Sequence, residues 1–274
     1  MNIPKGSVYG YVGPNGSGKT TTLDLLFAMG VPDGGTVQMC GIDAFRDEVA
    51  MKRKAAYMPT DISYATWGVV WKAIRFVRGF HTDRWDDAYC ESLLKRFDIG
   101  SHDKISSLSF GSQTKLALIL ALSWKPEILV LDEPSTGLDA LAKRELYAEL
   151  LDIVSDEERT ILVSSHNLAD LERFADHLGI IRKGKIIHEG PTNEIVDRYR
   201  LVKFQLPEGR DFESEPGLTL MANQGGHCQV LVDQKLVPIE ALAARGISVK
   251  NQTSLNLEDL FVALLKPNST SSDS

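Results

Sequence analysis

The feature that most constrains the fold is a glycine-rich loop near the amino terminus. It reads Gly-Pro-Asn-Gly-Ser-Gly-Lys-Thr at 13–20, between an apolar run at 8–12 and a helical pattern at 21–29 that ends before Gly30. A strand, a glycine loop and a helix in this order direct backbone N–H groups and a positive helix end at an anion. The pattern therefore predicts a strand–loop–helix unit that binds the phosphates of a nucleoside triphosphate.

The side chains of this loop suggest how the phosphates would be held. We expect Lys19 to reach the outer phosphates and the Thr20 hydroxyl to take one coordination position on Mg²⁺. The candidate phosphate contacts are Gly13, Pro14, Asn15, Gly16, Ser17, Gly18, Lys19, Thr20 and Thr21.

Two acidic residues follow a second apolar run, at 128–131. On a strand next to the phosphate loop, the Asp132 carboxylate can hold Mg²⁺ through the metal's bound waters. Glu133, one residue later, is placed to accept a proton from a water that attacks the γ-phosphorus, or to orient that water. His166 ends the next apolar run, and a neutral imidazole there can hydrogen-bond the γ-phosphate. Glu133 and His166 are the candidate catalytic residues.

A Ser-x-Gly turn precedes the helical run at 116–122. Ser109 and Gly111 offer an anion a hydroxyl, a backbone N–H and a helix dipole end. Taken alone, this turn is an ordinary helix cap. Because the first loop already holds one nucleotide, the spare turn predicts contact with the γ-phosphate bound by another copy of the protein.

Composition narrows the partners and the compartment. The net charge of −7 argues against a general affinity for nucleic acid. Three widely spaced cysteines, Cys40, Cys90 and Cys228, fit a reducing compartment rather than a disulfide framework or a zinc site. The apolar run at 116–122 is too short to cross a bilayer, and no charged-then-apolar leader opens the chain. We therefore expect a cytoplasmic protein whose membrane-spanning part, if it has one, is another polypeptide.

Strands that alternate with helices predict a three-layer α/β domain over 1–198. A helical insertion at about 60–125 carries a stripe of aromatic residues that we expect to be mostly core: Trp67, Trp71, Phe76, Phe80 and Trp85. Short alternating segments predict a small α+β accessory domain at 199–266, followed by a polar, disordered tail at 267–274.

Taken together, these residues resemble the ATP-binding cassette family over roughly 4–195, and most of all the ATP-binding subunits of ABC-2 type exporters. The resemblance implies a P-loop NTPase core with an antiparallel β subdomain and a helical insertion. It makes Leu108–Ser112 the family's signature, Asp139 part of the D-loop at 135–139, and His166 the switch histidine. The signature residues proposed to act across the dimer are Ser109, Phe110, Gly111 and Ser112.

The resemblance also implies cofactors and partners. The cofactors are ATP and Mg²⁺, and the activity is ATP hydrolysis coupled to transport. The partners are a second nucleotide-binding subunit, in a homodimer or heterodimer, and a separate transmembrane permease. The chain would then lie on the cytoplasmic face of the membrane, and no nucleic acid is expected.

The sequence departs from the family pattern at three places. Tyr-Met-Pro at 57–59 is followed by Thr60 and Asp61 where the family has Gln, so either residue is a candidate to hold a water on Mg²⁺. Phe110 and Ser112 stand where Gly and Gln are commoner. The family's first strands and their adenine-stacking aromatic have no counterpart, which implies a truncated start or the loss of base stacking.

Two other functions fit parts of the pattern. One is a soluble ABC-type ATPase that acts in assembly, on DNA or on the ribosome; the single cassette, the acidic charge and the absence of coiled-coil insertions weigh against it. The other is a regulatory subunit that binds ATP but hydrolyses it weakly, as Thr60 and the short start suggest. The transported substrate is not encoded in this chain's motifs.

Overall fold

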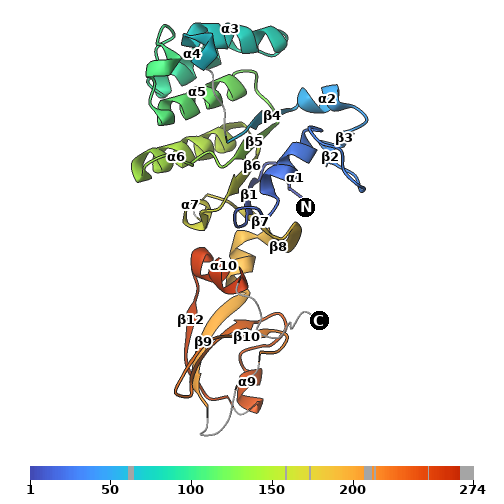
Figure 1. Ribbon diagram of the computed structural model, residues 1–274, viewed down its shortest axis with the longest axis vertical. Coiled ribbons are helices and arrows are strands. Elements are labelled where there is room, and N and C mark those ends of the chain that lie inside the picture. The colour runs from blue at the N-terminus through green and yellow to red at the C-terminus, as the bar shows by residue number, and fades with distance from the viewer. Residues whose placement is uncertain are drawn as a thin grey trace. The chain divides into compact units, whose positions relative to one another are not determined.

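The computed structural model describes residues 1–60, 65–157, 159–172, 174–206, 212, 214–245 and 247–265. The chain forms two compact units (Figure 1). The first contains Met1–His166 and Arg173–Ile187, and the second contains Asn167–Glu172 and the chain from His188 onward. The domain division at residue 198 stays a prediction, and the tail at 267–274 lies outside the described residues.

A six-stranded sheet organises the first unit. Its strands are β1 (Val8–Val12), β4 (Ala55–Met58), β5 (Ile128–Asp132), β6 (Thr160–Ser165), β7 (His177–Arg182) and β8 (Lys185–Pro191). They lie in the order β4-β5-β6-β1-β7-β8, and the pairs from β4 to β7 are parallel. Every residue of β1 and β6 is buried, as expected for parallel strands covered on both faces. The sheet therefore brings the carboxyl ends of β1, β5 and β6 to one edge.

Helices cover this sheet, and Figure 1 shows α1 and α6 on opposite sides of the strands. The helical elements of this unit are α1 (Lys19–Leu26), α2 (Glu48–Lys52), η1 (Ala65–Trp67), α3 (Val70–Phe80), α4 (Asp87–Arg96), η2 (Ile105–Ser107), α5 (Phe110–Leu122) and α6 (Ala140–Glu157). A short hairpin of β2 (Gln38–Met39) and β3 (Ile42–Asp43) precedes α2. This architecture is the predicted P-loop NTPase fold.

Helix α1 is shorter than its sequence pattern predicts. It ends at Leu26 because Ala28 turns left-handed, with a φ of +54°, and the N–H of Met29 donates to the carbonyl of Asp24 at 2.9 Å. Such a six-to-one bond closes a helix before any glycine is needed. Gly30 therefore follows the end of the helix instead of causing it.

The expectation that the aromatic stripe is mostly core is wrong, because three of its residues, all on α3, are exposed: Trp71, Phe76 and Phe80. Phe76 is 54% exposed and Phe80 is 70% exposed, and the two rings lie edge to face at 5.1 Å. The helix buries Val70 and Ala73 instead. Because residues four apart share a face of a helix, the two phenylalanines form one exposed patch, which Trp67 extends at 4.3 Å from Phe76.

The second unit is an α+β fold. Its antiparallel sheet has the order β10-β11-β9-β12, formed by β9 (Tyr199–Gln205), β10 (Leu218–Gln224), β11 (His227–Asp233) and β12 (Val249–Ser254). Its helices are α7 (Leu168–Glu172), α8 (Thr192–Asp197), α9 (Ala241–Ala244) and α10 (Leu257–Leu265). Val202, Val230 and Leu242 belong to its own apolar core, so this unit does not depend on the first for burial of its centre.

Candidate nucleotide site

The glycine loop has the backbone shape that a phosphate cradle needs. Gly16 and Gly18 have φ values of +74° and +104°, in the left-handed region where a side chain causes strain. A methyl group added at Gly13 would lie 2.6 Å from both the Ile181 carbonyl and the Ser17 hydroxyl. Pro14, Asn15 and Gly16 are exposed, and α1 begins within the last two residues of the loop, at Lys19.

Two polar groups of the loop are buried and available to a ligand. The Ser17 hydroxyl is buried and has no hydrogen-bond partner in the part of the chain that the structure describes. The Lys19 ammonium is 3.2 Å from Glu133 Oε1 and donates to the Gly13 carbonyl at 2.7 Å. A loop with a buried ammonium and a buried hydroxyl suits an oligophosphate, because the hydroxyl gains a partner and the ammonium gains a further anionic one when the phosphates bind.

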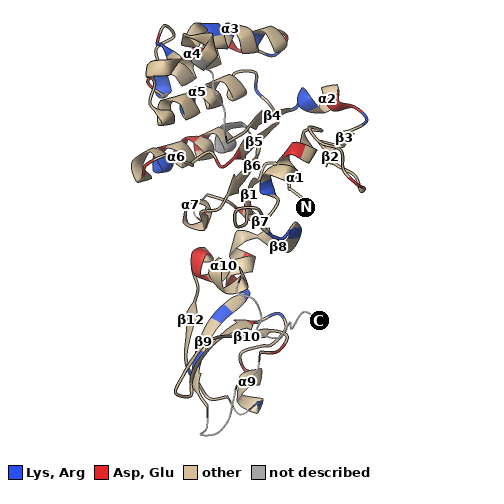
Figure 2. Ribbon diagram, viewed as in Figure 1, with Lys and Arg blue, Asp and Glu red and all other residues tan. Residues whose placement is uncertain are grey.

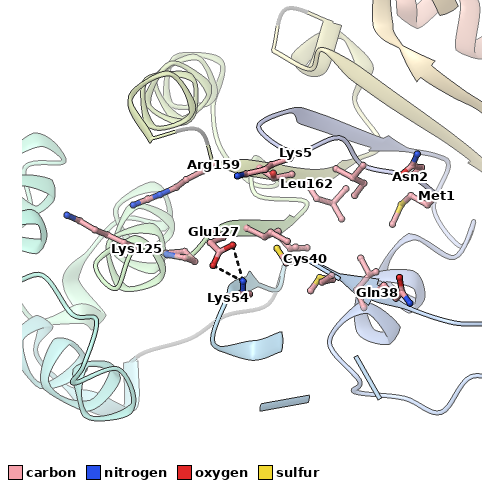
Figure 3. Close-up of a pocket in the computed structure, with 17 residues that line it drawn as sticks. Met1, Asn2, Lys5, Gln38, Cys40, Lys54, Lys125, Glu127, Arg159 and Leu162 are labelled. Atoms are coloured by element: carbon pink, nitrogen blue, oxygen red, sulfur yellow. Dashed lines mark hydrogen bonds and ion pairs between the residues drawn. The ribbon is translucent and has the colours of Figure 1, made fainter. Parts of the chain in front are cut away.

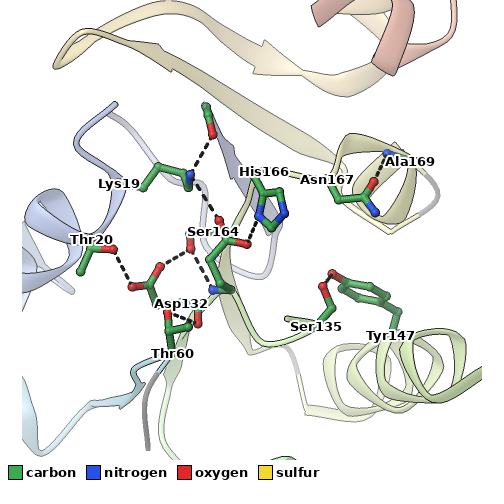
Figure 4. Close-up of polar contacts among 12 residues, drawn as sticks. Lys19, Thr20, Thr60, Asp132, Ser135, Tyr147, Ser164, His166, Asn167 and Ala169 are labelled. Atoms are coloured by element: carbon green, nitrogen blue, oxygen red, sulfur yellow. Dashed lines mark hydrogen bonds and ion pairs between the residues drawn. The ribbon is translucent and has the colours of Figure 1, made fainter. Parts of the chain in front are cut away.

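The Asp132 carboxylate lies at the carboxyl end of β5 and faces the phosphate loop (Figure 4). Its Oδ2 accepts a hydrogen bond from the Thr20 hydroxyl at 2.9 Å, and its Oδ1 accepts one from the Ser164 hydroxyl. Thr60 donates at 3.1 Å to the main-chain carbonyl of Asp132, so it lies beside this acid. Asp61, the other candidate at this position, lies outside the described residues.

The residues present fit a magnesium ion that arrives with its nucleotide. Mg²⁺ prefers oxygen ligands, keeps several waters and is usually held by one or two carboxylates together with substrate phosphates. Thr20 and Asp132 supply the two oxygens that converge here. Among the described residues there is no cluster of three His, Cys, Asp or Glu side chains that would hold a metal alone.

Glu133 and His166 are brought together, as their positions at the ends of neighbouring strands predict. His166 Nδ1 lies 2.7 Å from Glu133 Oε2, although the residues are 33 apart in the chain. The Glu133 side chain is only 13% exposed, whereas that of His166 is 51% exposed. The Glu133 carboxylate therefore lies between the Lys19 ammonium and the His166 imidazole.

Tyr57, on β4, borders the same region. Burial raises the pKa of this phenol well above its ordinary value, and the negative charges of Asp132 and Asp24 act in the same direction. The Tyr57 ring stacks on Phe27 at 4.9 Å. The side chain is therefore a neutral, packed part of the wall rather than a base.

The signature turn begins a helix, as predicted. Ser109 is the N-cap of α5, and its hydroxyl accepts the N–H of Ser112 at 3.1 Å. Sequence reasoning did not foresee that the Phe110 ring packs on the D-loop: a methyl group added at Gly137 would lie 3.1 Å from that ring. Asp139 caps α6 by accepting the N–H of Ala142 at 2.9 Å.

A separate cavity of about 720 Å³ lies at the opposite ends of the strands (Figure 3). Its lining includes Lys5, Lys54, Glu127 and Thr160, which stand at or before the amino-terminal ends of β1, β4, β5 and β6. None of the residues predicted to contact phosphate or to catalyse hydrolysis lines this cavity. This cavity is therefore not the candidate nucleotide site, although it is large.

Comparison with known proteins gives the same class as the fold. The family model described as "ABC transporter" matches residues 1–136, and a model described as an AAA domain, putative AbiEii toxin, matches 103–170. A solved structure titled "Structure of ATP binding subunit of ABC transporter" superposes with a TM-score of 0.64 at 24% identity. It covers 72% of this chain and 83% of that one. The fold is thus that of a P-loop ATPase.

Curated relatives extend the likeness along the chain. ABC transporter ATP-binding protein YtrB of Bacillus subtilis (strain 168) is 27% identical over 270 residues, covering 96% of this chain and 90% of the relative. Nod factor export ATP-binding protein I of Burkholderia orbicola (strain AU 1054) is 32% identical over 201 residues, covering 72% and 66%. The chain belongs to the family of ABC transporter ATP-binding subunits, and it is an ATP hydrolase. Among the described helices, none is both long and apolar enough to cross a bilayer.

Proposed function

We propose that this chain powers an exporter by closing against a second nucleotide-binding subunit around two molecules of ATP. In each site one subunit supplies the phosphate loop, and the Ser109–Gly111 turn of the other contacts the γ-phosphate. The exposed position of Ser109 at the start of a 13-residue helix supports this, because the turn presents a hydroxyl and a positive dipole end to a neighbouring molecule.

Glu133 is the proposed base for hydrolysis. It accepts one proton from water while the water oxygen bonds to the γ-phosphorus and the bond from that phosphorus to the bridging oxygen of ADP breaks. His166 holds the Glu133 carboxylate through its Nδ1, and Lys19 sets a positive charge beside it. Mg²⁺, held by Thr20 and Asp132, would draw negative charge from the phosphates. The single observation that carries this assignment is the cluster of Lys19, Glu133 and His166 within hydrogen-bonding or ion-pair distance.

The partner that moves the substrate is proposed to be a separate membrane permease. A groove of about 420 Å³ runs between the sheet and the helical insertion, and its wall includes Phe27, Met58, Val77 and Phe80. The exposed Phe76–Phe80 patch adjoins it, and Lys72, Arg75 and Arg78 lie on the same helix (Figure 2). An exposed apolar patch with charged neighbours is typical of a protein interface. With such a permease as its partner, the chain is proposed to lie on the cytoplasmic face of the membrane.

A Glu133→Gln variant tests the catalytic part and the dimer together. We expect ATP turnover to fall at least about 100-fold, as it does when a positioned base is lost. ATP binding should persist, so an ATP-bound dimer should accumulate and be visible by light scattering. Glu127→Gln is the matched control, since Glu127 precedes the other end of β5 and pairs with Lys54 at 3.2 Å. Unchanged turnover would contradict the role of Glu133, and a variant that stays monomeric in ATP would contradict the shared site.

The export assignment has its own test. Copurification of the chain with a membrane-spanning polypeptide should depend on Phe76 and Phe80. Recovery of the wild-type chain as a membrane-free ATPase bound to ribosomes or DNA would contradict the assignment.

A further inference from the structure

We propose that Ser164 is a positioning residue for ATP hydrolysis, whose single hydroxyl orients both acidic residues of the site. The inference rests on the roles proposed above for Asp132 and Glu133. Ser164 belongs to none of the motifs that the sequence analysis identified. It lies on β6, two residues before His166, and its side chain is fully buried.

Strand register brings Ser164 to the first acid. β5 and β6 are parallel, and Ser164 is the direct partner of Asp132 in the ladder. Paired residues of neighbouring strands point to the same face of a sheet. The Ser164 hydroxyl donates to Asp132 Oδ1, while Asp132 Oδ2 accepts from Thr20 at 2.9 Å. Because Oδ1 is fixed by serine, Oδ2 is the oxygen that faces the proposed magnesium position.

The same hydroxyl also holds the second acid. The Glu133 N–H donates to Ser164 Oγ at 3.0 Å and shares its hydrogen with the Ser164 carbonyl at 3.2 Å. Glu133 has a φ of +50°, a left-handed conformation that is strained for a residue other than glycine. Strained residues persist where their surroundings fix them from several sides. The hydrogen bonds that Ser164 accepts from the Glu133 N–H provide this fixation and so aim the Glu133 side chain at His166 and Lys19.

One atom thus has two tasks that no apolar side chain performs. A hydroxyl donates one hydrogen bond and accepts others at the same time. Here the donated bond orients a carboxylate that would hold the metal, and the accepted bond holds the main chain of the proposed base. Outer partners of this kind typically change metal affinity or activity about 10- to 100-fold when they are lost.

A Ser164→Ala variant of the full chain tests the proposal. We expect kcat to fall about 10- to 100-fold while the affinity for ATP without Mg²⁺ stays within about twofold, because Lys19 and the glycine loop are untouched. The binding of Mn²⁺, used as the probe with a nonhydrolysable ATP analogue and followed by electron paramagnetic resonance, should weaken about tenfold. This second measurement does not depend on turnover.

Ser123→Ala is the matched control. Ser123 is also fully buried, and its hydroxyl donates to the Ile119 carbonyl at 2.6 Å, inside α5 and the turn that follows it. It should lose comparable stability but keep wild-type kcat and Mn²⁺ binding. A Ser164→Ala kcat within about threefold of that of Ser123→Ala would overturn the proposal. If Glu133→Gln is inactive while Ser164→Ala turns over normally, the positioning role alone fails. If both variants keep turnover, the proposed role of Glu133 fails with it.

Discussion

Among the residues that the structure describes, each unit buries one aspartate, and the two carboxylates are held in opposite ways. Asp132, in the ATPase unit, is 1% exposed and accepts hydrogen bonds from two neutral hydroxyls, Thr20 and Ser164. Asp233, in the carboxyl-terminal unit, is 7% exposed and meets the Arg198 guanidinium with both oxygens, at 2.7 and 2.5 Å. A buried carboxylate needs compensation for its charge. The hydroxyls around Asp132 do not neutralise its charge, so a bound cation can do so. The Arg198 guanidinium already neutralises Asp233 within the fold.

The surroundings of Asp233 show how a buried carboxylate is compensated within the fold. The bonds from Arg198 hold the pKa of Asp233 below its ordinary value against the effect of burial. Burial raises the pKa of Tyr199 to about 12, and its hydroxyl lies 3.5 Å from Asp233 and 3.3 Å from His188. Burial also lowers the pKa of His188, and the Arg198 charge adds to this effect. The partners of a buried acid, rather than its burial, therefore distinguish a ligand site from a structural ion pair.

The largest expected effect comes from removing the Lys19 ammonium from the candidate nucleotide site. Lys19→Ala should weaken ATP binding about 100-fold or more, because a buried ammonium that pairs with phosphate is lost. Titration with a fluorescent ATP analogue measures this. Lys54→Ala is the control, since Lys54 is a partly exposed partner of Glu127. A dissociation constant within about threefold of the wild-type value would show that Lys19 serves the fold and not the ligand.

The next effect should follow from breaking the ion pair between Arg198 and Asp233. Arg198→Met leaves Asp233 buried without its counter-charge and should lower the free energy of unfolding of the second unit by about 3 kcal/mol. Hydrogen exchange of the β9 and β11 amides measures this. All four tryptophans lie in the first unit, at 67, 71, 85 and 124, so their fluorescence reports separately on the ATPase core.

The matched control for Arg198 is Arg245→Met, which removes an exposed ion pair with Glu215 in the same unit. Exposed pairs contribute about 0–1 kcal/mol, so this variant should be close to wild type. Both arginine variants should bind ATP normally. Loss of ATP binding in Arg198→Met would mean that the two units share one energetic network.

The smallest predicted effect is a pH dependence of the second unit. Because the folded pKa of His188 is below its ordinary value of 6.5, the unfolded chain binds the proton more readily. The free energy of unfolding should therefore decrease as pH falls through 6.5, from the His188 contribution, and remain level above it. Hydrogen exchange of β9 between pH 8 and 5.5 tests this.

His188→Gln should flatten that pH profile, whereas His227→Gln, at an exposed position on β11, should not. Asp233 titrates below its ordinary value of 3.8 and Tyr199 near 12, so neither contributes in this range. An equal slope in wild type and His188→Gln would contradict the assignment.

Much of the candidate site could be predicted from the sequence, because its parts are contiguous. The glycines at 16 and 18, the acids that end β5 and the serine that caps α5 each have a local role that the sequence pattern indicates. The meeting of Glu133 and His166 was also predictable, because parallel neighbouring strands end at one edge. The roles of these residues in phosphate binding and hydrolysis stay predictions until the variants are made.

Other contacts depend on register and packing. No local pattern indicates that Ser164 lies beside Asp132, that Phe110 covers Gly137, or that Arg198 finds Asp233 across 35 residues. The exposure of Phe76 and Phe80 likewise depends on which face of α3 meets the rest of the unit.

Local sequence patterns are enough to predict the class of this protein: a strand, a glycine loop and a helix, with acids at the end of a buried strand, specify a P-loop ATPase. Which hydroxyl contacts which carboxylate, and which buried acid is already paired with a cation, depend on tertiary contacts instead. The physical reason is that backbone conformation and capping are set by neighbours along the chain. Hydrogen bonds between distant residues are set by strand order and register, which emerge only when the whole sheet has formed.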